Sequence, residues 1–144
     1  MGPVVLDTSI YIAALRAGSN ALLQLRRFTP SGVVWLSAVV LEELYAGVRP
    51  SDLHVIERLE HDFDRVGRVL VPNLNDWASA GKVLARLATK YDYEQIGRAR
   101  LANDALLAMS AARCGMTLVT TNARDFARLA SFRPFQWQLS TTFP

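Results

Sequence analysis

The sequence predicts an α/β fold: a single domain, residues 1–144, in which a parallel sheet of about four to five strands carries helices on both faces. Short apolar runs alternate along the chain with segments of helical spacing, and strands separated by helices form right-handed βαβ units with a parallel sheet. The 144 residues are 51% apolar. That is enough for one domain with a buried core.

Five short runs are predicted as strands. Runs without polar residues are typical of strands that are buried on both faces, and the alternating run near the C-terminus indicates an edge strand. The five predicted strands are Val4–Leu6, Val33–Leu36, Val69–Val71, Met116–Thr120 and Phe135–Leu139.

Polar residues that can cap helices follow the first two strands. Thr8 or Ser9 is the predicted N-cap of a helix after the first strand, and Ser37 is the predicted N-cap of a helix that ends at Gly47. Between these two helices, residues 21–32 are predicted as a second helical piece and a turn.

Two amphipathic helices are predicted in the middle of the chain. The first is capped by Ser51, and the second begins at Asn73 or Asn75. The helical spacing predicts one buried stripe on each. The stripes are Leu53, Ile56, Leu59, Phe63 and Val66 on the first, and Leu74, Trp77, Gly81, Leu84, Leu87 and Tyr91 on the second. Two further helices are predicted at about Arg100–Arg113 and Asn122–Leu129.

The composition excludes several classes of site. The single cysteine, Cys114, excludes an internal disulfide and a cysteine-based zinc cluster. The two histidines, His54 and His61, leave little for a histidine metal site or a Ser-His-Asp triad. No apolar run is long enough to span a membrane and the N-terminus lacks a signal-peptide pattern, so we expect a cytoplasmic protein with no membrane partner.

Acidic residues recur where the predicted sheet presents the carboxyl ends of its strands. Asp7 directly follows the first strand, although it also suits a helix cap. Glu42 and Glu43 follow the second strand, and because neighbouring helix positions differ by about 100°, only one of them can face inward. Glu43 is the better placed for this edge, and Glu42 is expected to face solvent.

The third and fourth acids lie further along the chain. Asp104 lies in an apolar helix beside Asn103, where a charge is costly unless it is paired or metal-bound; the alternative is that Asn103 caps the helix and Asp104 lies in its first turn. Asp125 follows the fourth strand, with Asn122 as a candidate cap.

Four carboxylates at one edge would repel one another and raise one another's pKa. A divalent cation removes that cost. Oxygen ligands favour a hard ion, so Mg²⁺ or Mn²⁺ fits better than zinc, and such a site suits hydrolysis of phosphodiester bonds. If these acids surround a metal, the other residues comprise 16 basic and 9 acidic ones, a net +7 against +3 for the chain.

Four segments resemble a known family, the PIN domain, and within it the VapC-type toxins of bacterial toxin-antitoxin pairs. The segments are Val4–Ser9, Leu41–Gly47, Asn103–Ala108 and Leu118–Phe126. The resemblance implies a Mg²⁺- or Mn²⁺-dependent endoribonuclease that cuts structured RNA such as tRNA or rRNA. It also implies a homodimer and a cognate antitoxin.

The resemblance also implies roles for individual residues. Asp7, Glu43 and Asp104 match the family's acids, and the variable fourth position falls on Asp125 or on Asn122. The residues expected around the metal site are Thr8, Ser9, Asn103, Thr120 and Asn122, and the candidate RNA contacts are Arg98, Arg100 and Arg124. The alternative function is an RNA-binding or metal-binding regulatory module with little or no catalysis.

Overall fold

Five parallel strands form one sheet in the computed structural model, which describes residues 2–18, 33–91 and 98–140. The strand order is β3-β2-β1-β4-β5, and every neighbouring pair is parallel. The strands are β1 (Val4–Leu6), β2 (Val34–Ser37), β3 (Val69–Leu70), β4 (Thr117–Thr120) and β5 (Trp137–Leu139). The predicted α/β fold is confirmed, and β5 lies at an edge as expected.

The strand order reverses beside β1. The chain builds β1, β2 and β3 outward in one direction, and then crosses back to add β4 and β5 on the other side of β1. In register, Val4 lies opposite Thr117 and Leu6 lies opposite Val119. Open parallel sheets bind ligands outside the carboxyl ends of the strands at such a switch point. Here that point lies between the ends of β1 and β4.

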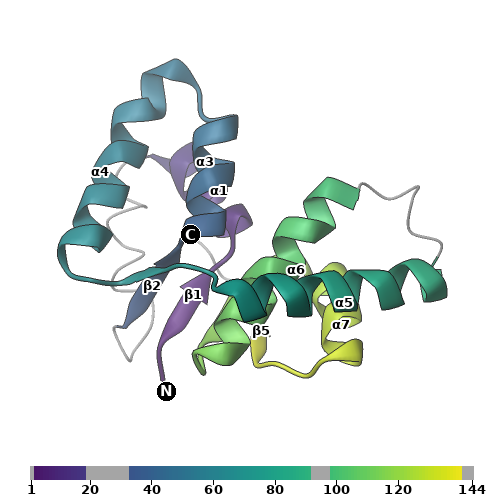
Figure 1. The fold of residues 1–144 in the computed structure, drawn as a ribbon. Helices are drawn as coiled ribbons and strands as arrows, with labels where there is room; N and C mark the ends of the chain where they lie inside the picture. Colours follow the sequence, from purple (N-terminus) through teal and green to yellow (C-terminus); the bar gives the residue numbers. More distant parts are fainter. Residues whose placement is uncertain (1, 19–32, 92–97, 141–144) are drawn as a thin grey trace.

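Six α-helices and one short 3-10 helix cover the sheet in the described part of the chain. Figure 1 shows the first three α-helices on one side of β1 and the last three on the other. They are α1 (Thr8–Ala17), α3 (Ala38–Gly47), α4 (Leu53–Arg65), α5 (Leu74–Tyr91), α6 (Arg98–Arg113) and α7 (Ala123–Phe132), with η2 (Pro50–Asp52) before α4. The predicted helical piece and turn at residues 21–32 lie outside the described residues.

The first helix caps differ in part from the prediction. Asp7, rather than Thr8 or Ser9, is the N-cap of α1, because its carboxylate accepts a hydrogen bond from the Thr8 N–H. Ser37 caps α3 as predicted, since its hydroxyl oxygen accepts from the N–H of Val39 at 3.1 Å. Ser51 is no N-cap, because it lies inside η2.

The predicted stripe of α4 is correct only in its middle. Ile56, Leu59 and Phe63 are buried, whereas Leu53 and Val66 are 40% and 50% exposed. The two exposed residues lie at the first position of α4 and just past its last residue, and only the middle of the helix is packed against the rest of the domain. The spacing of apolar residues predicted the buried face of α4 correctly, but it could not predict at which residues the burial ends.

The predicted stripe of α5 is confirmed in the second half of the helix, where Leu87 is buried and Leu84 and Tyr91 pack against the core, but it is wrong in the first half. Leu74 and Trp77 are 85% and 62% exposed. The residues that α5 buries are Asp76, Ser79, Ala80, Val83 and Leu87. A buried carboxylate must be paired or hydrogen-bonded, and Asp76, only 1% exposed, has such partners.

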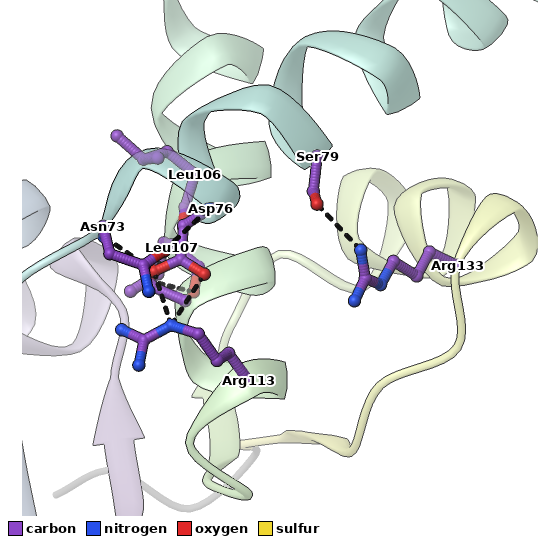
Figure 2. A network of polar contacts seen from close by, with 8 residues as sticks. Asn73, Asp76, Ser79, Leu106, Leu107, Arg113 and Arg133 are labelled. Atoms are coloured by element: carbon purple, nitrogen blue, oxygen red, sulfur yellow. Dashed lines mark hydrogen bonds and ion pairs between the residues drawn. The ribbon is translucent and has the colours of Figure 1, made fainter.

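Those partners are an arginine and a capping residue (Figure 2). The Nε of Arg113, at the end of α6, donates to both carboxylate oxygens of Asp76 at 2.9 Å. Asn73, one of the two predicted starting residues, caps α5. The side-chain oxygen of Asn73 accepts from the Asp76 N–H, and the backbone N–H of Asn73 donates to the Asp76 carboxylate, each at 2.9 Å. The polar pair therefore decides which face of α5 is buried.

No helix in the described residues is long and apolar enough to cross a membrane.

Removing the Arg113 side chain tests this explanation. We expect Arg113→Ala to lower the free energy of unfolding by about 3 kcal/mol, because it leaves the Asp76 carboxylate buried without its cation. The measurement is urea unfolding. Arg65→Ala is the matched control, since Arg65 also lies in the last turn of a helix but makes no ion pair among the described residues. Equal unfolding midpoints for the two variants would show that the pair does not hold α5.

Candidate active site

The Asp7 carboxylate lies at the switch point and is held on both oxygens. Its backbone N–H continues the sheet by donating to the Val119 carbonyl at 2.9 Å. Oδ1 accepts from the Thr8 N–H at 2.8 Å, and Oδ2 accepts from the hydroxyls of Ser9 at 3.1 Å and Thr120 at 2.8 Å. Asp7 is only 6% exposed. Donors from α1 and β4 thus fix one carboxylate at the end of the central strand.

A second carboxylate, Glu43, is joined to Asp7 through one threonine. The Thr8 hydroxyl donates to Oε1 of Glu43 at 2.7 Å, while the N–H of the same residue donates to Asp7. Glu43 is half-buried on α3, whereas Glu42 is exposed. The structure therefore brings Glu43, and not its neighbour, to the site.

The surroundings of Glu43 disfavour its negative charge. Burial is the largest influence and raises the pKa of its carboxyl above the ordinary value of 4.5. The hydrogen bond from Thr8 opposes this shift, the negative charge of Asp7 adds to it, and a hydrogen bond from Asn103 again lowers the pKa. The net effect is a raised pKa. Without further positive charge, the site carries an electrostatic strain.

The third strand-end acid, Asp125, is tied to the same network. The N–H of Asn122 donates to the Thr120 hydroxyl oxygen at 2.9 Å, and its side-chain Nδ2 donates to Oδ2 of Asp125 at 2.9 Å. Asn122 also caps α7 by accepting from the Asp125 N–H. Hydrogen bonds thus run without a break from Glu43 through Asp7 and Thr120 to Asp125. Both Asn122 and Asp125 remain candidates for the fourth position.

The fourth acid lies on α6. Asp104 is 6% exposed, and the adjacent Asn103 is the residue whose side chain hydrogen-bonds Glu43. Because α6 begins at Arg98, Asp104 lies in the interior of the helix. The alternative in which Asn103 caps this helix is therefore excluded.

The three predicted RNA contacts are unequally placed. Arg124 is exposed in the first turn of α7, beside Asp125. Arg98 and Arg100 begin α6, but their side chains lie outside the described part of the structure.

The donor set fits a hard divalent cation. In residues 2–18, 33–91 and 98–140, no three acidic, histidine or cysteine side chains are grouped as metal ligands as they stand. Hydroxyls and an amide separate the carboxylates instead, which reduces like-charge repulsion. The available donors are carboxylate, amide and hydroxyl oxygens, the ligands that Mg²⁺ and Mn²⁺ favour. A cation beside Glu43 would offset the burial that raises its pKa.

A groove of about 290 Å³ opens beside Glu43. The sequence analysis did not identify its two basic residues, Arg16 and Arg49. Helical periodicity could have found the first, because Arg16 lies two turns after Thr8 on the same face of α1. Arg49 follows the end of α3 and gave no comparable signal.

The chain matches one family model and several solved structures. The family model of the PIN domain matches residues 4–131. Among solved structures, the chain is similar to DNA-bound VapBC from Salmonella typhimurium, with a TM-score of 0.69 and 22% identity over 96% of this chain and 98% of that one. It is also similar to VapBC-1 from nontypeable Haemophilus influenzae, with a TM-score of 0.65 and 24% identity over 98% and 100% of the two chains. FitAB bound to an IR36 DNA fragment has a TM-score of 0.66 and 19% identity, with 94% of each chain covered. No curated protein matches the chain.

The raised pKa of Glu43 gives a pH-dependent expectation for stability. A carboxyl whose pKa is higher in the folded than in the unfolded state binds more protons when folded, so stability falls as pH rises from 4.5 through the folded pKa. We expect Glu43→Gln to be more stable than the wild type at neutral pH in EDTA, and the difference to vanish below 4.5. Thermal unfolding at the two pH values measures it. A difference that does not change with pH would contradict the electrostatic explanation.

Proposed function

The chain belongs to the PIN-domain family, and we propose that it is a metal-dependent endoribonuclease toxin of a toxin-antitoxin pair, which hydrolyses structured RNA such as tRNA or rRNA. One observation carries this proposal: the hydrogen-bonded series of carboxylates that runs from Glu43 through Asp7 to Asp125 at the switch point of the sheet. The site is oxygen-rich and acidic, as metal-assisted phosphodiester hydrolysis requires.

The residues suited to hold Mg²⁺ or Mn²⁺ are Asp7, Glu43 and Asp104, with Asp125 acting directly or through water and Asn122 as its polar neighbour. Such a cation, when bound, lowers the pKa of a coordinated water and stabilises charge on the phosphoryl oxygens. The number of ions is open, since a second one can arrive with the substrate.

The chain's own groups orient the site. Ser9 and Thr120 hold one oxygen of Asp7, and the Thr8 N–H holds the other, so this carboxylate enters the reaction already oriented. The two histidines of the chain, His54 and His61, are exposed on α4. An imidazole general base is therefore not supplied from α4, and the attacking water must lose its proton by another route.

The proposed partners are RNA, a cognate antitoxin and a second copy of the chain. The similar structures of VapBC and FitAB support the antitoxin partner, because both are described as complexes. The groove beside Glu43 is a suitable place for a partner segment, since Ile12, Leu15 and Val48 give it apolar walls. The proposed place of action is the cytoplasm, where tRNA and rRNA are found.

The alternative is a regulatory module that binds RNA or a metal with little catalysis. The spacing of the carboxylates supports this alternative. In the described residues, hydroxyls and an amide separate the carboxylates, which are not grouped as metal ligands. The two functions differ in one observable: only the enzyme breaks the RNA chain.

Cleavage of labelled tRNA in Mg²⁺ or Mn²⁺ tests the proposal. We expect Glu43→Gln and Asp104→Asn each to lower the cleavage rate by at least about 100-fold, because each removes a carboxylate proposed to hold the cation. EDTA should abolish cleavage by the wild type.

Glu42→Gln is the matched control, since it removes the adjacent but exposed carboxylate from the same helix. It should cleave like the wild type. Full activity of the wild type in EDTA, or of Asp104→Asn, would contradict the mechanism. Tight RNA binding without any cleavage would favour the regulatory module.

A further inference from the structure

Six basic side chains lie along α5, α7 and the residue that follows α7. We call them the basic track: Lys82, Arg86, Lys90, Arg124, Arg128 and Arg133. The two lysines of the chain are both in this set. All six are exposed except Arg128, which is partly buried.

The track has a regular geometry on α5. Lys82, Arg86 and Lys90 are four residues apart, so they form one stripe along the helix. With a rise of 1.5 Å per residue, the stripe is about 12 Å long. That length spans several phosphates, since one strand of a duplex carries a phosphate about every 3.4 Å.

Within residues 2–18, 33–91 and 98–140, no acid is paired with this stripe. The single acid of α5, Asp76, is buried against Arg113, and the single acid of α7, Asp125, is bound by Asn122. Among the described residues, no ion pair joins the basic track to a carboxylate. By contrast, α4 mixes both signs of charge, since it carries four acids and two arginines. The track is therefore a local excess of positive charge.

Contacts between the two helices order the track. The guanidinium of Arg128 lies 4.7 Å from the centre of the Tyr91 ring, and Nζ of Lys90 lies 5.3 Å from the same ring and 5.7 Å from that of Phe132. Nη1 of Arg133 donates to the Ser79 hydroxyl at 2.9 Å, and Figure 2 shows this arginine reaching from the end of α7 toward α5. Cations that are already positioned lose less side-chain entropy when they bind a ligand.

These contacts also fix the direction of the track. Tyr91, at the end of α5, contacts the middle of α7, whereas Ser79, near its beginning, contacts the residue after α7. The track therefore extends from Arg124, beside Asn122 and Asp125 at the start of α7, to Arg133 just after the end of that helix. Its far end is a hollow of about 360 Å³ lined by Lys82, Arg86 and Arg133.

We propose that the basic track binds the phosphodiester backbone of RNA on one side of the bond to be cut, and guides the strand into the carboxylate site. This inference rests on the proposed function of that site. A ligand that reaches from the acidic site along the whole track must be a long polyanion, and its phosphates match a line of cations that no carboxylate of the described residues pairs with. The track also offsets the repulsion that the carboxylates exert on RNA.

Binding of labelled bulk tRNA in EDTA separates the track from the chemistry. The track variant is Lys82→Gln with Arg86→Gln, and the matched control is Arg58→Gln with Arg65→Gln on α4. Each removes two exposed charges from a helix and introduces a good helix former. If both track residues contact phosphates, affinity at 0.1 M salt should fall on the order of 25-fold, and the slope of log K against log salt should become less steep by about 1.4. In cleavage assays, KM should rise while kcat stays unchanged.

Equal affinity of the track variant and the control would overturn the inference. So would a poly-glutamate peptide that binds the wild type as tightly as tRNA does and loses affinity in the track variant, because the track would then recognise an acidic protein. Track-dependent RNA binding without cleavage would refute the proposed function and leave the track in place. Cleavage by a protein whose RNA binding does not depend on the track would refute this inference and leave the proposed function in place.

Discussion

The hydrogen bonds around Asp7 are the constraint on which the site depends. This carboxylate ends the central strand and accepts from α1 and from β4, so it joins the two halves of the sheet where the strand order reverses. Thr8 extends the connection to Glu43, and Thr120 extends it to Asn122. The same contacts that close the fold at this edge also set the positions of the acids. A change in any of these donors therefore affects both stability and the proposed chemistry.

Much of this could be predicted from the sequence, because the positions of strands and the faces of helices are local consequences of residue pattern. Apolar runs located the strands, and the 100° step of a helix separated Glu43 from Glu42. The role of Asp7 as a cap was one of two alternatives that the sequence left open, because a carboxylate at a strand end suits several partners equally, and the bridge through Thr8 could not be predicted. The hydrogen bonds that Asp7 and Thr8 form depend on how β4 and α3 pack against α1.

The error on α5 has the same physical origin. Apolar spacing selected Leu74 and Trp77, but the helix buries Asp76, since an arginine from the far end of α6 compensates that charge. A contact between residues 37 positions apart leaves no trace in local periodicity. Its consequence is also electrostatic, because it removes the single acid of α5 from the surface. The modest net charge of the chain thus combines an acidic edge of the sheet with a basic face on α5 and α7.

The central claim is that the carboxylates at the end of the sheet bind a divalent cation. Titration of the protein with Mn²⁺, followed by the electron paramagnetic resonance signal of the free ion, measures this binding without RNA or turnover. We expect the wild type and Glu42→Gln to bind Mn²⁺ alike, and Asp7→Asn to lose that binding while it remains folded. Unchanged Mn²⁺ binding by Asp7→Asn would contradict the claim.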